Sequence, residues 1–146
     1  MARAKDKTLS LNSPDLKVRM VDFLCFYSGV VNITTDKELN KRYPTVKPFV
    51  LSLFNKHNLI IKTNLELASY NFSTIGKDTL VFSKKNTKTL CLLRHIRNAI
   101  AHWNIQQYSD GSVTIRDFKD NSKSKITCYG ILSIENLYQL LNIKNS

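Results

Sequence analysis

The segment LCLLRHIRNAIAHWN, residues 90–104, combines a strongly apolar pattern with arginine, histidine and asparagine side chains that are costly to bury without partners. On a helix that turns about 100° per residue, its apolar side chains gather in one arc. This arc consists of Leu92, Leu93, Ile96, Ala99, Ile100 and Trp103. The opposite arc carries Arg94, His95, Arg97, Asn98 and His102, with the small Cys91 and Ala101 between them. The pattern predicts an amphipathic helix over 88–103 that buries one face.

The polar arc of this helix is chemically unusual. It has no lysine and no glutamate, the residues that normally solvate an exposed helix face. It offers instead guanidinium groups, which bind phosphate oxygens bidentately, and imidazole groups, which exchange protons near neutral pH. This combination favours a face that binds phosphate and moves protons.

The composition fits one globular domain with a polyanionic partner. The chain has 146 residues, 42% of them hydrophobic, which is enough for a proper core. Only four glycines and three prolines occur, which favours helices over a turn-rich β-sandwich. The formal net charge of +11 favours nucleic acid or an anionic surface as partner. The alternative is that this charge serves solubility alone.

The cysteines and histidines indicate neither a disulfide framework nor a metal site. Cys25, Cys91 and Cys128 are odd in number and far apart, and we expect them to be reduced. The histidines have no zinc-like spacing with them, so we expect no metal and no cofactor. No apolar signal core follows the basic N-terminus, and the run Phe23–Tyr27 is too short to span a bilayer. The sequence predicts a cytoplasmic protein without membrane contact.

Periodicity and capping residues predict further helices around the central segment. Ser13, Pro14 and Asp15 are typical of a helix start. The expected elements are a mobile basic arm at 1–12, helices at 13–31, 34–43, 45–62, 88–103 and 133–144, a short helix and loop at 62–83, and an antiparallel meander at roughly 104–131. We therefore expect one mainly α domain over 13–146, a helical bundle with a small β-meander before the C-terminal helix.

The stretch RNAIAH, Arg97 to His102, resembles the motif of the HEPN (higher eukaryote and prokaryote nucleotide-binding) superfamily. In that motif an arginine and a polar residue, often asparagine, precede a histidine, with four to six residues between arginine and histidine. Here Asn98 is the polar residue and four residues intervene. The resemblance covers about residues 88–105. It implies a HEPN-like helical bundle that dimerises and, in many members, a metal-independent endoribonuclease acting as a bacterial toxin or antiviral effector. It also implies a possible antitoxin partner, often a nucleotidyltransferase.

The residues support this chemistry on their own terms. RNA is cut without a metal when its 2′-OH attacks the adjacent phosphate, which requires a base, an acid and cations around the phosphorane. His102 can serve as base or acid, Arg97 can hold the phosphate oxygens, and Asn98 can orient either partner. Arg94 and His95 are candidate RNA contacts.

A dimer follows from the count of proton-transfer groups. Each chain supplies one motif histidine, whereas acid–base catalysis requires two groups. Arg97 and His102 differ by about 140° around the helix, so they flank the polar face. A two-fold axis through this face would give one cleft with two copies of each.

Three alternatives stay open from the sequence. The chain could be a catalytically inactive HEPN module that binds RNA or a partner, or a basic DNA-binding regulator, although no helix-turn-helix signature is present. The matched residues could also be an ordinary exposed face. The sequence does not decide whether Trp103 lines the site or the core.

Overall fold

The computed structural model describes residues 10–56, 58–63, 76–83, 87–119 and 125–143. Within these ranges the chain forms five helices and a five-stranded mixed sheet. The elements in chain order are α2 Pro14–Ser28, α3 Asp36–Arg42, α4 Val46–Lys56, β1 Ile60–Thr63, β2 Thr79–Phe82, α5 Lys88–Ala101, β3 Ile105–Gln107, β4 Ser112–Phe118, β5 Ile126–Ser133 and α6 Ile134–Leu141.

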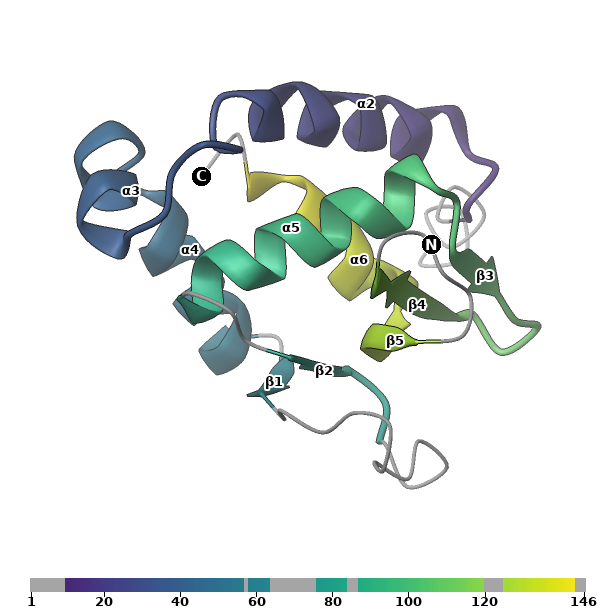
Figure 1. The fold of residues 1–146 in the computed structure, drawn as a ribbon. Helices are drawn as coiled ribbons and strands as arrows, with labels where there is room; N and C mark the ends of the chain where they lie inside the picture. Colours follow the sequence, from purple (N-terminus) through teal and green to yellow (C-terminus); the bar gives the residue numbers. More distant parts are fainter. Residues whose placement is uncertain (1–9, 57, 64–75, 84–86, 120–124, 144–146) are drawn as a thin grey trace.

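The helix that carries the polar motif lies in the middle of the molecule. Figure 1 shows α5 between α2 on one side and the sheet on the other. The strand order is β1-β2-β5-β4-β3, with β1 parallel to β2 and the remaining pairs antiparallel. Both α2 and β4 pack directly on α5. This central helix is therefore covered from two sides, and only a narrow part of its surface is left exposed.

The prediction of a mainly α bundle is wrong, because the sheet makes the fold α/β. The meander predicted for 104–131 is present as β3, β4 and β5, but β2 pairs with β5 and β1 extends the sheet further. The expected helix over 45–62 ends at Lys56, and β1 follows. Asn58 has a φ of 56°, a left-handed conformation that a continuing helix does not allow.

Strand β2 was not predicted from the sequence because its residues do not alternate between polar and apolar. All four of its residues are buried, as expected for a strand inside a sheet with both faces covered. A short apolar run of this kind lacks the period of two that identifies a half-buried strand. The short helix expected within 62–83 coincides mostly with 64–75, which lie outside the described residues.

The predicted helix starts are confirmed where polar side chains cap them. Ser13 Oγ accepts a hydrogen bond from the Leu16 N–H, and Ser133 Oγ accepts one from the Asn136 N–H, both at 3.2 Å. Of the predicted arm, residues 1–9 lie outside the described residues. Leu11 is buried in the core, and its N–H donates to Gln107 Oε1 at 2.9 Å. The described end of the arm thus packs against β3.

None of the described helices is long and apolar enough to cross a membrane. The longest, α2, has 15 residues and carries charged side chains along its length.

The close pairing of β2 and β5 depends on Gly130. In the register, Gly130 lies opposite Leu80, and a Cβ added to this glycine would collide with the Leu80 side chain. Since Leu80 is fully buried, it has little room to move. We expect Gly130→Ala to lower the free energy of unfolding by about 1–3 kcal/mol, measured by urea denaturation.

Gly76→Ala is the matched control for this substitution. Gly76 is exposed, and a Cβ there would meet only the Thr79 hydroxyl at 3.9 Å, an ordinary contact distance. An equal loss of stability in the two variants would show that the approach of Leu80 is not the cause.

Candidate active site on helix α5

Helix α5 presents a stripe of polar residues along its uncovered edge. Arg97 and His102 are exposed, and Arg94 and Asn98 are half-buried. Arg94, Asn98 and His102 follow one another at intervals of four residues along one side of the helix, and Arg97 lies beside this line, three residues after Arg94. Ala101, also exposed, adds no bulk between them. Four of the five predicted site residues are thereby brought together on one surface.

Asp117 on β4 holds this stripe in place from the side of the sheet, through contacts with two residues of α5. It was not among the residues predicted from the sequence. Its Oδ2 accepts a hydrogen bond from Asn98 Nδ2 at 3.0 Å and lies 2.8 Å from His95 Nδ1. Its Oδ1 accepts from the Phe118 N–H at 2.8 Å. A signal was available: in VTIRDF, Asp117 continues the inward phase of Val113 and Ile115, where a carboxylate requires a partner.

Asp117 stays ionised despite its burial. Burial alone would raise the pKa of this carboxyl, but the hydrogen bonds from His95 and Asn98 and the charge interaction with His95 outweigh it and lower the pKa below its ordinary value. An ionised carboxylate only accepts hydrogen bonds, so His95 Nδ1 must carry the proton and donate it. The interaction is therefore a charge-assisted bond between α5 and β4.

The hydrogen bonds that begin at Asp117 continue through Asn98 to Arg97 at the surface. Asn98 donates to Asp117 through Nδ2, which fixes the orientation of its amide, and its Oδ1 accepts a hydrogen bond from Arg97 Nη1 at 2.9 Å. A buried carboxylate thus sets the position of an exposed guanidinium through one amide. Arg97 uses one Nη for this contact, and its other N–H groups remain for a ligand.

His95 differs from the other predicted site residues. It is 1% exposed, its ring centroid lies 5.2 Å from that of Phe82, and its Nε2 is 3.4 Å from the Ser83 carbonyl oxygen. The wheel analysis assumed one buried face, whereas α5 is buried against both α2 and the sheet. His95 faces the sheet, so in this structure it makes the contacts of an internal anchor and offers RNA no exposed atom.

The end of α5 turns sharply just after the motif histidine. His102 is the C-cap residue, and Trp103 follows with a φ of 52°. The Trp103 N–H donates to the Ile100 carbonyl at 3.1 Å and the Asn104 N–H to the Ala99 carbonyl at 2.8 Å, which is the Schellman pattern of a helix end. Trp103 is 51% exposed, so it is not a core residue.

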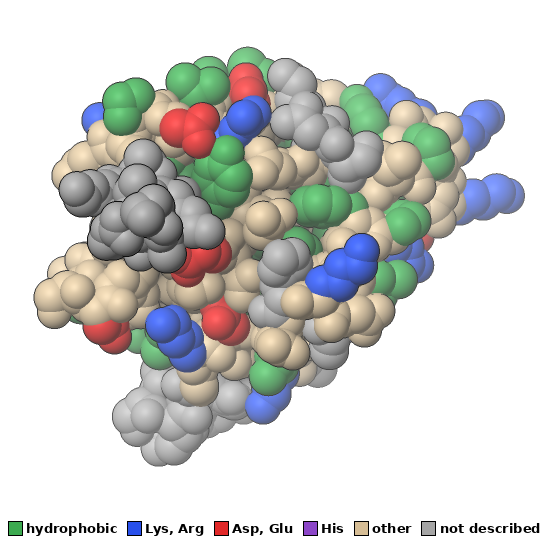
Figure 2. Space-filling view, turned by 180° about the vertical axis from the view of Figure 1, so that it is seen from behind, with side chains coloured by type: hydrophobic (Ala, Val, Ile, Leu, Met, Phe, Trp, Pro, Cys, Tyr) green, Lys and Arg blue, Asp and Glu red, His purple; other side chains and the backbone are tan. Residues whose placement is uncertain are grey.

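The positive charge of the chain is spread over the surface seen in Figure 2. On the described part of this face, basic side chains are interspersed with acidic and hydrophobic ones and form no continuous basic patch. Within the described ranges, no group of three or more His, Cys, Asp or Glu side chains could hold a metal ion.

Comparison with protein families identifies the class of this fold and site. The family model HEPN pEK499 p136 matches residues 19–143, which is most of the chain and includes α5 with its motif. The chain therefore belongs to the HEPN pEK499 p136 family, as the motif predicted. Comparison with curated proteins and with solved structures gave no match.

Loss of the Asp117 carboxylate should destabilise the domain. Asp117→Ala leaves His95 buried without its partner, and removing one member of a buried charge-assisted pair costs about 3 kcal/mol. We expect a loss of this size in urea denaturation at neutral pH. Because the folded-state pKa of Asp117 is lowered, its contribution is present above about pH 4 and is lost as the pH falls through the folded pKa.

The same experiment on Asp15→Ala supplies the control. Asp15 forms an exposed ion pair with Arg19 at 4.0 Å, and such surface pairs contribute less than about 1 kcal/mol. The stability difference between wild type and Asp117→Ala should shrink on acidification, whereas a difference that grew below pH 4 would contradict the assignment of an ionised Asp117.

Proposed function

We propose that the protein is a metal-independent endoribonuclease whose active site is the polar stripe of α5. The observation that carries the proposal is the line of contacts from buried Asp117 through Asn98, about one helical turn before His102, to the exposed Arg97. Membership of a HEPN family adds to it, because the chain has the motif at this position. A face held in place from the core in this way is suited to binding a ligand with charge and directionality.

Arg97 binds the scissile phosphate. Its guanidinium is held by Asn98 before any ligand arrives, which reduces the conformational freedom lost on binding. Two parallel N–H groups of a guanidinium match two non-bridging phosphate oxygens, and these oxygens gain negative charge in the phosphorane. Arg94, half-buried on the same stripe, adds a second positive charge nearby.

His102 transfers the protons. Its ring is exposed and makes no hydrogen bond or ion pair with any residue that the structure describes. As base, it removes the proton of the ribose 2′-OH while that oxygen forms a bond to phosphorus. The bond from phosphorus to the 5′-oxygen breaks, and an acid returns a proton to this leaving oxygen. The products are a 2′,3′-cyclic phosphate and a 5′-hydroxyl end.

The second proton-transfer group comes from a second copy of the chain. Two α5 stripes facing each other across a two-fold axis would supply two His102 imidazoles and two Arg97 guanidiniums to one cleft. Exposed apolar side chains on α2, which packs on α5, support association beside that cleft: Val18 and Val21 are more than half exposed. With Arg94 included, the two chains bring four arginines to the cleft. Their guanidinium groups would repel one another in a dry cleft, so the cleft stays hydrated or holds an anion.

The biological setting that fits this activity is a bacterial toxin or an antiviral effector. An unrestrained ribonuclease in the cytoplasm would stop growth. The proposal therefore includes a restraining antitoxin, for which a nucleotidyltransferase is the candidate. The restraining partner would act by covering the α5 stripe or by preventing its dimerisation.

His102→Ala and Arg97→Ala should each reduce RNA cleavage by about 100-fold or more, because they remove the proton carrier and the phosphate ligand. Both side chains are exposed, so the fold should persist. The measurement is cleavage of labelled single-stranded RNA by purified protein, with EDTA present and the product ends analysed for 2′,3′-cyclic phosphate. In growing bacteria, expression of the wild type should slow growth and His102→Ala should relieve the effect.

Arg42→Ala is the matched control for the loss of one positive charge. Arg42 lies on α3, where its guanidinium makes a long, exposed contact with Glu38 at 3.8 Å and lies 5.8 Å from the centroid of the Tyr43 ring. Its cleavage rate should equal that of the wild type. Full activity of His102→Ala, or a strict magnesium requirement, would refute the mechanism, and salt-dependent binding without cleavage would favour an inactive binding module.

The dimer has its own measurement. Light scattering at micromolar concentration should give about twice the chain mass of 16.8 kDa. Mixing inactive Arg97→Ala and His102→Ala chains should restore partial activity, because a mixed cleft keeps one arginine and one histidine. A monomer that cleaves RNA at the full rate would rule out the shared cleft.

A further inference from the structure

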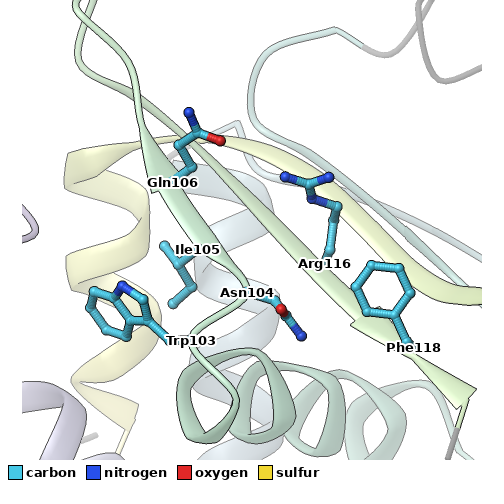
Figure 3. A pocket seen from close by; sticks show the side chains of 6 residues that line it. All are labelled: Trp103, Asn104, Ile105, Gln106, Arg116 and Phe118. Carbon is cyan, nitrogen blue, oxygen red and sulfur yellow. The ribbon is translucent and has the colours of Figure 1, made fainter. Parts of the chain in front are cut away.

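A pocket opens beside the end of α5, on the side of the sheet away from that helix. It is lined by Trp103, Asn104, Ile105, Gln106, Arg116 and Phe118 and has a volume of about 400 Å³. This size lies within the range of small-molecule and cofactor sites, about 300–1,000 Å³. Figure 3 shows the rings of Trp103 and Phe118 on opposite sides, with the side chains of Asn104 and Arg116 between them.

The backbone at Trp103 is strained, and the strain places its indole at this pocket. The residue has a φ of 52° at the left-handed position of the Schellman turn, where glycine or asparagine is normally found. A bulky side chain in this conformation is a genuine outlier. Half of the indole surface is exposed, so core packing does not compensate for the strain. Strained residues of this kind cluster at ligand sites, where the geometry serves binding.

The lining combines the groups that recognise an unpaired base. Bases of single-stranded RNA stack on aromatic rings or guanidinium planes and form hydrogen bonds along their edges. Trp103 and Phe118 supply the rings, and the Gln106 amide supplies an Nε2 donor, while its Oε1 accepts a hydrogen bond from the Tyr108 hydroxyl at 3.4 Å. Among the described residues no carboxylate pairs with Arg116, so its guanidinium is available to an incoming ligand.

The pocket and the proposed active site meet at one peptide bond. His102 and Trp103 are consecutive, so their Cα atoms are about 3.8 Å apart. The two sites also share the end of β4: Asp117 faces α5 and fixes Asn98, whereas the preceding Arg116 faces the pocket. The Arg116 N–H donates to the Asn104 carbonyl at 3.0 Å, which ties the turn after α5 to this strand. The pocket therefore begins at the residue that directly follows the motif histidine.

We propose that this pocket binds an unpaired base of the RNA, stacked on Trp103, next to the phosphate that His102 and Arg97 engage. The inference rests on the proposed ribonuclease function and adds a substrate class to it: single-stranded RNA, read through one flipped-out base beside the cleavage point. Duplex RNA, with its bases paired and stacked, would not enter the pocket.

The chain supplies its own reporter for this interaction, because Trp103 is its single tryptophan. Short single-stranded RNA is titrated into the 146-residue His102→Ala chain, which should not cleave it, and tryptophan fluorescence is recorded. We expect saturable quenching by single-stranded RNA. An oligonucleotide with the same number of phosphates but without bases, and a duplex of the same sequence, should leave the fluorescence unchanged. Equal quenching by the abasic strand would overturn the proposal in favour of a simple anion site.

Substitutions separate recognition from folding. Trp103→Gly removes the ring and relieves the backbone strain, so it should stay folded and bind single-stranded RNA about 10-fold more weakly by fluorescence polarisation. Trp103→Phe should retain most of the affinity. Trp103→Asn, which also tolerates the left-handed conformation, repeats the test should the glycine variant fail to fold. Arg116→Gln should weaken binding more than Arg42→Gln, which removes the same charge on α3.

The outcomes distinguish this inference from the proposed function. Should the wild type cleave RNA through His102 while Trp103→Gly binds and cleaves equally well, the pocket assignment fails and the ribonuclease stands. Should single-stranded RNA quench Trp103 without any cleavage by the wild type, the catalytic proposal fails and the pocket stands. Unchanged fluorescence with an RNA that binds by polarisation would overturn the inference directly.

Discussion

The buried carboxylate of Asp117 is the interaction on which the organisation of this molecule depends. It joins β4 to α5 through His95 and holds the amide of Asn98, which in turn holds Arg97 at the surface. A charge in a core is tolerated only when it is fully partnered, so each of these contacts constrains the others. The polar residues of this largely apolar helix therefore have two roles. His95 and Asn98 complete an internal hydrogen-bond network, and Arg97 extends that network to the surface.

The sequence predicted the central helix and the family better than the fold. The period of 3.6 residues and the RNAIAH motif located α5, and membership of a HEPN family confirmed the family assignment. What failed was the assumption that a helix has one buried side. Because α5 is packed between α2 and the sheet, His95 lies inside although it shares the polar arc with Arg97. Neighbours that lie far apart in sequence decide such a position, and periodicity carries no information about them.

The sequence failed to predict β1 and β2 for the same reason, namely that neighbours far apart in sequence determine them. Strand β2 is buried on both faces, and β1 follows Asn58, a residue in the left-handed conformation between α4 and the strand. Neither has the alternation that identified β4, so the local pattern is ambiguous, and the pairing of β2 with β5 and of β1 with β2 determines the structure. By contrast, Asp117 was within reach of the sequence, since a charged residue in the inward phase of an alternating strand implies a buried partner. The sequence did not indicate a role for Arg116 or Trp103, because the pocket that they line forms only when the turn after α5 is packed beside β4.

The tight turn between β3 and β4 has a consequence for which insertions the chain can accept. Gly111, with a φ of 86°, and Asp110, whose Oδ1 accepts from both the N–H and the hydroxyl of Ser112, set where β4 begins. A change of length here that shifted β4 by one position against its neighbours would turn every one of its side chains to the opposite face. Arg116 would then point at α5 and Asp117 would point away from it. Such a register shift would remove the contacts of Asp117 with α5 and the pocket in one step, without altering any residue of either.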